Sequence, residues 1–376
     1  MPAVSKVLVV GGGAAGAASA ILLAEAGVEV DLIEIKPDIV TLGSGITLQG
    51  NALRVLRGLG VWDRVEAAGY GFNELGLRAP DPAGTLLAVL PDARTGGPDL
   101  PATVGMPRQE LARILHDRAT QVGVKIRLAT TCTGLDQDEN GVDVELSDGS
   151  DGRYDLVVGA DGIRSWTRRM LGVMLETRST GMGIWRAFTT RPASVTRTDL
   201  FYGGPSYIAG YCPTGPDSLY AYIVEPAQDR SGLTPDEQLT EMQRLSEAYG
   251  GPWDEIRSTL TDASRISYTW FETHVLDEPW NRGRVVLIGD AAHACPPTLA
   301  QGAAQALEDA AVLAELLLTR AAVDAGLWAE FTARRYSRAR TVVEASVQLG
   351  QWLLDGERGD VPALMGRIAA LVTDPA

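Results

Sequence analysis

The stretch KVLVVGGGAAG, residues 6–16, decides the fold. Its first half is a short apolar run that ends in glycine, which predicts a buried parallel strand. The alanine-rich residues that follow, up to Ala26, have the length and composition of a helix, and Gly27 stops it. Residues 28–33 predict the next strand. Together these segments form a βαβ unit about 30 residues long, the usual start of a dinucleotide-binding domain.

The turn between this strand and helix is a GxGxxG motif, Gly11 to Gly16. Its first glycine permits a tight turn, the second lets a pyrophosphate approach the backbone, and the third lets helix and strand pack closely. The helix N-terminus adds free N–H groups and the positive end of its dipole. About 20 residues later a carboxylate, Glu34, ends the second strand, where it can accept ribose hydroxyls. The cofactor-binding residues expected here are Gly11, Gly13, Ala14, Ala15, Gly16, Glu34, Ile35 and Lys36.

Composition limits the class of protein. A chain of 376 residues suits two lobes better than one core. The net charge of −15 and the lack of a basic stripe exclude a nucleic-acid binder, and an acidic surface disfavours anionic membranes. Four arginines do gather near the C-terminus, and we interpret them as one solvated helix face rather than a phosphate site: Arg334, Arg335, Arg338 and Arg340.

Cysteine and histidine usage is equally restrictive. The chain has three cysteines without CxxC spacing, which predicts a reducing, cytoplasmic setting. Its three histidines show no metal-ligand spacing, so no metal site is expected. His293 could be taken for a base, but we expect it to pack or to bond the backbone.

The rest of the chain alternates between segments typical of helices and segments typical of strands. Helices are expected at 49–59, 107–121 and 235–249, and throughout the alanine- and leucine-rich region from 301 onward. Residues 80–105 are rich in proline and glycine and predict an excursion rather than core. Aromatic residues crowd 180–225 with strand periodicity, which predicts an antiparallel sheet inserted into the first lobe. The remaining expected strands are 124–128, 132–136, 142–146, 154–158 and 284–288.

Two later segments favour FAD over NAD. Residues 155–164 read DLVVGADGIR, and residues 284–293 read RVVLIGDAAH. Each is an apolar strand that delivers an aspartate beside a glycine at its C-terminal end, where open α/β sheets bind ligands. Three such strand ends meeting at one edge suit a long cofactor with many hydroxyls.

This ordered set resembles the para-hydroxybenzoate hydroxylase family of single-component FAD-dependent aromatic hydroxylases, over nearly the whole chain. The GxGxxG motif matches, as do the family's DG motif at Asp161-Gly162 and its GD motif at Gly289-Asp290. Residues 302–310 look like the family's helix after the flavin loop, and Arg108 matches the family arginine that contacts the cofactor. The segment 43–59 looks most like the salicylate hydroxylase and urate hydroxylase branch.

The resemblance implies an α/β fold: a Rossmann-like FAD-binding domain of the GR2 type, an inserted antiparallel β-sheet substrate domain and C-terminal helices. The FAD-binding domain would be discontinuous, at 1–75, 100–178 and 266–320. The substrate domain would occupy 76–99 and 179–265, and the C-terminal helices 321–376.

The resemblance also assigns roles to single residues. Asp290 would bond the ribityl chain, and Asp161 would support both flavin and transient NAD(P)H binding. Asp161 could equally cap a helix near Arg164, and the two roles are compatible. Gly302, Ala303 and Ala304 open a helix whose free N–H groups would face the flavin pyrimidine edge, where reduced flavin carries negative charge.

The implied reaction consumes NAD(P)H and O2 and hydroxylates a small phenolic or N-heteroaromatic substrate through a flavin C4a-hydroperoxide. The protein would be a monomer or a homodimer. A halogenase or epoxidase is a rival, although the halogenase segment WxWxIP is missing. The DG and GD motifs argue against an NAD-dependent dehydrogenase. A flavin-binding protein without turnover, such as a sequestering or sensor module, stays open.

A substrate anchor is expected in the aromatic sheet. Strand alternation puts Ile184, Arg186 and Phe188 on one face and Trp185 on the other. An arginine between two apolar residues is costly to bury unless it finds an anion. Arg186 is therefore the candidate anchor, with a structural ion pair as the alternative. The residues expected to complete the pocket are Tyr202, Tyr211, Tyr222 and Pro297.

Overall fold

A mostly parallel sheet organises the first lobe of the computed structural model, which describes residues 2–38, 44–277 and 279–376. Its strand order is β18-β19-β12-β1-β2-β8, and only β18 runs antiparallel to its neighbour. The strand and the helix predicted from the opening stretch are confirmed. The strand bounds are β1 Lys6–Val10, β2 Glu29–Ile33, β8 Lys125–Arg127, β12 Leu156–Gly159, β18 Asn281–Arg282 and β19 Val285–Leu287.

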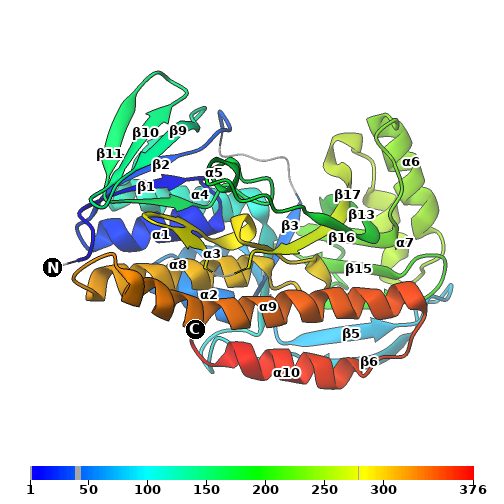
Figure 1. Ribbon diagram of the computed structural model, residues 1–376. Helices are drawn as coiled ribbons and strands as arrows, with labels where there is room; N and C mark the ends of the chain where they lie inside the picture. The colour runs from blue at the N-terminus through cyan, green and yellow to red at the C-terminus, as the bar shows by residue number, and fades with distance from the viewer. Residues whose placement is uncertain (1, 39–43, 278) are drawn as a thin grey trace.

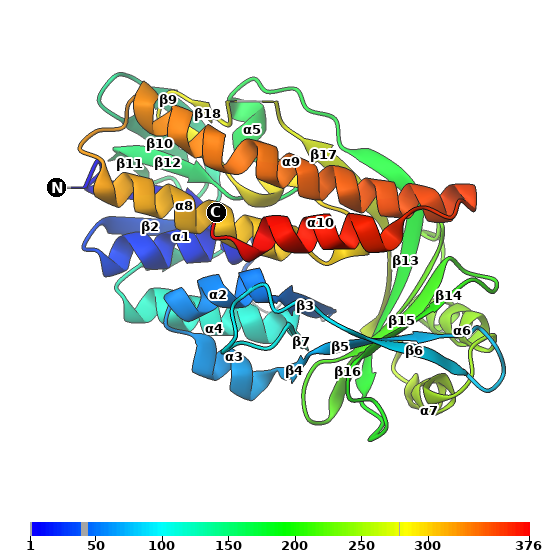
Figure 2. The ribbon, with the colours of Figure 1, turned by 90° about the horizontal axis from the view of Figure 1, so that it is seen from below.

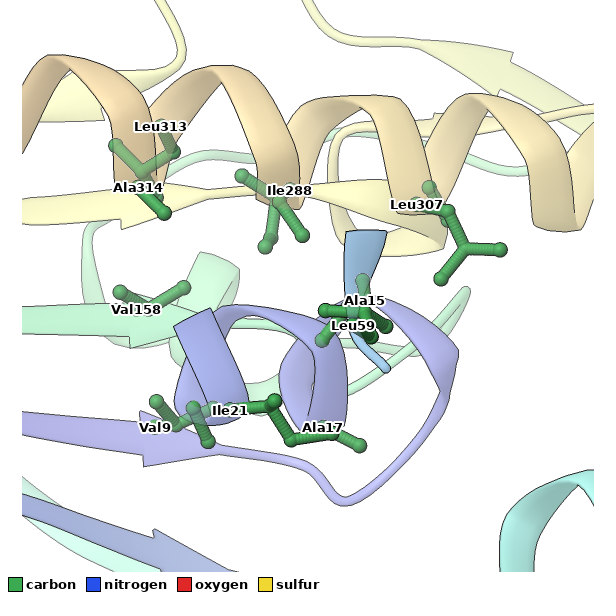
Figure 3. Close-up of a cluster of buried hydrophobic side chains, with 14 of the residues drawn as sticks. Val9, Ala15, Ala17, Ile21, Leu59, Val158, Ile288, Leu307, Leu313 and Ala314 are labelled. Atoms are coloured by element: carbon green, nitrogen blue, oxygen red, sulfur yellow. The ribbon is translucent and has the colours of Figure 1, made fainter. Parts of the chain in front are cut away.

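Both faces of this sheet are covered, which explains why β1 is apolar throughout. Val7 and Val9 pack with the helices α1 (Ala14–Glu25) and α8 (Gly302–Thr319). Figure 3 shows side chains of β1, β12 and these two helices in one cluster. The alternate residues, Leu8 and Val10, pack against a separate three-stranded sheet. That sheet has the order β11-β10-β9, with bounds β9 Cys132–Gln137, β10 Val142–Leu146 and β11 Asp151–Tyr154.

The predicted aromatic sheet is present as a larger, mainly antiparallel one. Its order is β20-β17-β13-β16-β15-β14-β5-β6 in the described residues. One face packs against α6 (Pro235–Ser246) and α7 (Pro252–Thr259), as Figure 1 shows. The strand bounds are β5 Glu74–Arg78, β6 Leu86–Pro91, β13 Arg178–Thr190, β14 Thr198–Tyr202, β15 Ile208–Pro213, β16 Ser218–Pro226, β17 Ile266–Val275 and β20 His293–Ala294.

A small sheet joins the two lobes. It has the order β3-β7-β4, with bounds β3 Gly45–Gln49, β4 Tyr70–Phe72 and β7 Thr103–Pro107. A Cβ on Gly45 would lie 2.5 Å from Cβ of Tyr220, and one on Gly105 would lie 2.1 Å from the carbonyl oxygen of Pro213. Since neither position has room for a side chain, glycine is what lets this sheet approach β15 and β16 so closely.

Three local predictions need correction. The region 80–105, expected to be an excursion, ends in a buried strand, β7. The strand was not predicted because its apolar run is short and lies among prolines and glycines. The strand expected at 154–158 begins at Leu156, and Tyr154 instead ends β11. β17 pairs with β13, so the larger sheet continues to residue 275, past the boundary expected at 265. Gly43, the first residue of the branch-specific segment, lies outside the described residues.

The C-terminal region is helical, as predicted. Helix α9 (Ala325–Asp355) runs along both lobes in Figure 1, and α10 (Val361–Thr373) lies beside it in Figure 2. The expected solvated arginine face is wrong for two of its members, because Arg335 and Arg338 are only 0% and 8% exposed. Both pair with Glu308 of α8. These two arginines therefore belong to a buried charge network between α8 and α9 and not to a solvated helix face.

Three more helices pack beside the small sheet. They are α2 Gly50–Gly58, α3 Trp62–Ala68 and α4 Arg108–Gln121, and a short α5, Trp166–Met170, follows β12. The residue before α4, Pro107, is its N-cap rather than its first helical residue. Among the described residues no helix is both long enough and apolar enough to cross a membrane.

Candidate active site

The three sequence motifs meet at one edge of the parallel sheet. The ladder pairs Val10 with Ile33 and with Gly159, and Gly159 with Leu287. These residues lie at or next to the C-terminal ends of β2, β1, β12 and β19, where the loops of a parallel sheet form ligand sites. The glycine turn, Glu34, Asp161 and Asp290 therefore all follow adjacent strand ends.

The glycines of the first turn have distinct reasons for being glycine. Gly11 has a φ of +105°, and a Cβ there would lie 2.4 Å from the carbonyl oxygen of Ala160. A Cβ on Gly16 would lie 1.9 Å from the carbonyl oxygen of Gly11. At Gly13, by contrast, a Cβ would meet no atom within 4 Å. Close packing therefore requires glycine at Gly11 and Gly16, whereas Gly13 borders open space that a pyrophosphate can enter.

Glu34 is held by backbone donors beside this turn. Its Oε2 accepts from the N–H of Gly12 at 2.8 Å, and its Oε1 accepts from the N–H of Lys36 at 3.0 Å. A carboxylate offers about four acceptor positions, so two remain for ribose hydroxyls. Ile35 and Lys36 are exposed directly after it. Sequence reasoning missed His116, whose Nε2 lies 2.7 Å from the carbonyl oxygen of Gly12.

Two helices begin at this edge without a capping side chain. Neither α1 nor α8 has a side-chain hydrogen bond at its N-cap or an acidic residue in its first turn. Gly289 lies between them, because a Cβ there would be 3.1 Å from Cβ of Ala15 and 3.2 Å from Cβ of Ala306. Both free N-termini therefore flank the GD turn, an arrangement that favours negative charge. Gly302 and Ala303 are half-buried, and Ala304 is buried.

Asp290 stands out in this setting. Its side chain is exposed, and its carboxylate has no hydrogen-bond partner in the described part of the chain. The protein packed around it raises the pKa of this carboxyl, while His293 and Arg108 oppose the rise. Arg108, at the start of α4, is exposed and close enough to act on this charge.

Asp161 is engaged by its own helix. Its carboxylate accepts from the hydroxyl of Ser165 and, at 2.8 Å, from the N–H of Thr167. Asp161 was expected to cap a helix, to support cofactor binding, or both. These two contacts show the capping role. Arg164 points elsewhere and pairs with Glu272 at 3.3 Å.

His293 is enclosed by protein and paired with a buried acid. It is 1% exposed, and its Nε2 lies 2.6 Å from Oδ2 of the fully buried Asp309. Trp280 packs against its ring, with centroids 5.0 Å apart. A structural role was expected, but the partner is a buried carboxylate of α8 rather than the backbone.

Arg186 lies on the same face of its sheet as Tyr220, which packs on Gly45 of the small sheet. It is paired with Tyr222 across β13 and β16, and its Nε donates to the hydroxyl of Tyr220 at 3.0 Å. A second bond goes to the hydroxyl of Thr269. Its partners in the described residues are these two hydroxyls, with no carboxylate within 4.0 Å of the guanidinium, so the alternative of a structural ion pair is not realised there. An arginine without an acid keeps its charge available for an anion.

The strand β3 connects Arg186 to the start of α8. Tyr220, the partner of Arg186, packs on Gly45 at one end of β3. At the other end, Gln49 bonds the side chain of Gln301, the N-cap of α8. Asn51 donates to the same Gln301 at 3.1 Å. No local pattern pointed to these amides, because their contacts form only where the strand and the helix meet.

Tyr222 and Tyr202 share the face of Arg186. The ring of Tyr222 lies across Gly210, and its hydroxyl has no hydrogen-bond partner among the described residues. Burial raises its pKa well above the usual range, so this hydroxyl keeps its proton. Tyr202 is 38% exposed near the end of β14, and Pro297 is exposed at the start of the short helix Pro297–Leu299. Tyr222 is the better placed pocket residue of the two tyrosines.

Tyr211 does not join them, and its expected place in the pocket is wrong. It pairs with Ala221, one residue out of phase with Tyr222, and so points to the opposite face. There it is 1% exposed, and its hydroxyl donates to Asp199 at 2.7 Å. Because side chains alternate along a strand, a shift of one residue moves a side chain from one face of the sheet to the other.

Tyr211→Phe is accordingly expected to lower the free energy of unfolding by about 1–3 kcal/mol without changing substrate KM, because a buried carboxylate loses one donor. Denaturant unfolding monitored alongside steady-state kinetics measures both quantities. A rise in KM at unchanged stability would return Tyr211 to the pocket.

Comparison with known proteins extends over most of the chain. Residues 4–346 match the family described as "FAD binding domain". The putative FAD-dependent monooxygenase YetM of Bacillus subtilis is 32% identical over 98% of this chain and 98% of its own length. The 3-amino-4-hydroxybenzoate 2-monooxygenase of Streptomyces cremeus is 32% identical over 84% of this chain and 79% of its own length. The crystal structure of P. aeruginosa PqsL with 2-aminobenzoylacetate is 25% identical, covering 98% of this chain and 99% of that one at a TM-score of 0.82.

Proposed function

The chain belongs to the FAD-binding domain family as a flavoprotein monooxygenase, and on that basis we propose that its substrate is a small phenolic or N-heteroaromatic compound bearing an anionic group. The observation that carries the proposal is Arg186, a guanidinium with hydroxyl partners and no carboxylate among the described residues. The names of two relatives support it, since 3-amino-4-hydroxybenzoate and 2-aminobenzoylacetate are both aromatic acids.

The residues at the sheet edge fit FAD. The free N-terminus of α1 and the open side of Gly13 suit the pyrophosphate, and the remaining acceptor positions of Glu34 suit a ribose. The carboxylate of Asp290, which has no partner in the part of the chain that the structure describes, suits the ribityl hydroxyls. The uncapped start of α8 suits the anionic edge of a reduced flavin. When bound, FAD supplies the redox chemistry and the activation of O2, with NAD(P)H as a transient co-substrate.

The chain's own residues have simpler tasks. Arg186 binds and orients the anionic group, because a guanidinium fork matches a carboxylate. The protonated hydroxyl of Tyr222 can donate a hydrogen bond to the ring substituent. The apolar face around them limits the access of water.

The division of the chain follows from this proposal. We assign cofactor binding to the discontinuous parts at 1–75, 100–178 and the region after β17 up to 320. Substrate binding belongs to 76–99 and to 179–275. Three free cysteines, two of them buried, suit a reducing compartment, and we place the protein in the cytoplasm.

A substrate screen tests the proposal directly. Purified protein loaded with FAD is incubated with NAD(P)H and a set of hydroxylated aromatic acids, each paired with its uncharged amide. The acids are expected to stimulate NAD(P)H oxidation more than the amides and to give a hydroxylated product. Flavin that binds tightly while no compound stimulates oxidation would instead indicate a sequestering or sensor module. A protein without affinity for FAD would overturn the assignment altogether.

Substrate binding is also expected to accelerate the reduction of the bound flavin by NAD(P)H. In rapid-mixing experiments without O2, NAD(P)H alone should bleach the bound flavin slowly, and an active ligand should accelerate the bleaching. The expectation follows from the family resemblance, because a substrate trigger prevents wasteful NAD(P)H consumption. Equal bleaching rates with and without every active ligand would refute the trigger while leaving hydroxylation intact.

A further inference from the structure

The backbone of the GD turn is held by three buried side chains from three different elements. The N–H of Gly289 donates to Oδ2 of Asp309 in α8 at 2.9 Å. The carbonyl oxygen of Asp290 accepts from Nε2 of His274 in β17 at 3.0 Å. The carbonyl oxygen of Ala291 accepts from the guanidinium of Arg168 in α5 at 2.8 Å. The carboxylate of Asp290, by contrast, has no hydrogen-bond partner in the described residues.

Asp309 is an acceptor at every contact. It is fully buried; Oδ2 also meets His293, and Oδ1 accepts from Nε of Arg335 at 2.7 Å. Burial on its own would raise the pKa of this carboxyl, but the charges of His293 and Arg335 outweigh it and lower the pKa. The group is therefore a carboxylate, which suits its role as acceptor of the Gly289 N–H.

His274 is fixed as a neutral donor. A carbonyl oxygen can only accept, so the proton must be on Nε2, and Nδ1 accepts from the hydroxyl of Thr177 at 2.9 Å. Burial, helped by the nearby charge of Arg168, lowers the pKa of His274 to about 4. The ring therefore keeps one tautomer over the physiological pH range.

Arg168 completes the set from the side of the other motif. It is 2% exposed and donates to the carbonyl oxygens of both Ala291 and Ile163. Ile163 directly follows Asp161-Gly162, so one guanidinium spans the DG and GD turns. In the described part of the chain, no carboxylate lies within 4.0 Å of Arg168. Its guanidinium donates to backbone carbonyl oxygens instead.

We propose that Asp309, His274 and Arg168 are positioning residues that hold the Gly289–Ala291 turn in one conformation and so present the carboxylate of Asp290 to FAD. Because that carboxylate has no partner among the described residues, the backbone of the turn fixes its position before the cofactor arrives. Preorganisation of this kind increases affinity by reducing what must be ordered on binding. The inference rests on the proposed role of Asp290.

The test compares two variants of the same charge network. Asp309→Ala removes the acceptor of the Gly289 N–H, whereas Arg335→Met removes a charged partner of Asp309 but leaves the Asp309 side chain in place. We expect Asp309→Ala to raise the FAD dissociation constant about tenfold, the scale of one lost hydrogen bond to a buried group. It should also shift the visible absorption spectrum of the FAD-saturated protein. Arg335→Met should lower the Tm of the apoprotein but change the dissociation constant less than about threefold.

Proportional losses of FAD affinity and Tm in both variants would overturn the proposal, because they would show general loosening. So would unchanged affinity in Asp309→Ala.

A second pair of variants leaves no buried charge unpaired. His274→Leu removes the donor to Asp290, and its site borders a cavity of about 200 Å³ that can accommodate the change. His274→Gln keeps an N–H donor at similar reach. Weakened FAD binding in the leucine variant with recovery in the glutamine variant supports positioning, and equal behaviour of the two contradicts it.

The Asp290→Ala variant, which removes the acceptor altogether, separates this inference from its premise. If its FAD affinity is unchanged, the turn does not hold the cofactor, and both the assignment and the inference fail. If its affinity falls while Asp309→Ala and His274→Leu bind FAD normally, the assignment survives and the inference alone is wrong.

Discussion

Replacement of Asp290 by alanine is expected to give protein that loses FAD during purification. The wild-type carboxylate is exposed, surrounded by protein and without a partner in the described residues, so it is free to accept the cofactor's hydroxyls. Hydrogen bonds to a charged group contribute about 1.5–3 kcal/mol each, so one such bond corresponds to about a 10- to 150-fold weaker affinity. Absorbance of the purified protein, together with titration of the apoprotein with FAD, measures the effect.

A matched control is available close by in the sequence. Asp277 is also an exposed aspartate, but it lines the cavity behind His274 instead of the sheet edge. Asp277→Ala should retain FAD as the wild type does. Stoichiometric FAD in purified Asp290→Ala would contradict the assignment of this carboxylate, and equal loss in both variants would point to a general effect of charge.

Arg186→Leu is expected to raise the KM for the anionic substrate by about tenfold or more while FAD stays bound. Leucine retains much of the bulk but removes one charged hydrogen bond, which is worth about 1.5–3 kcal/mol. The uncharged amide of the same substrate should be affected much less, because it never used the charge. Steady-state kinetics with the acid and the amide, at saturating NAD(P)H, separates these outcomes.

Another arginine of the same sheet serves as the control. Arg78 in β5 does have a carboxylate partner, since its Nε lies 2.6 Å from Oδ2 of the buried Asp199. Arg78→Leu should therefore reduce thermal stability and leave KM unchanged. If Arg186→Leu behaves in the same way, Arg186 is a structural residue and the substrate anchor lies elsewhere.

Local signals in the sequence predicted the framework correctly. The apolar run and glycines of residues 6–16 specify a strand, a turn and a helix from short-range sterics and burial alone. The two aspartates of the DG and GD motifs come to the same edge as the first turn because parallel strands share one C-terminal edge. The alternation of Ile184, Arg186 and Phe188 likewise follows from the two-residue period of any strand.

Contacts between distant segments could not be predicted in this way. The face that Tyr211 occupies depends on the register of β15 against β16, and a one-residue difference reverses it. The arginines of α9 look solvated until α8 places Glu308 and Asp309 against them. The strand β7 is buried only because the small sheet lies between the two lobes.

The sequence by itself thus determined the βαβ start, the motifs that mark a flavoprotein and the strand ends where we propose that the cofactor binds. Each of these depends on a few neighbouring residues, whose conformations are limited by sterics and by the need to bury apolar surface. Only the tertiary structure decided which side chains hold the GD turn, because His274, Arg168 and Asp309 come from three separate elements. Their meeting is set by sheet order, register and helix packing, which are properties of the folded chain as a whole.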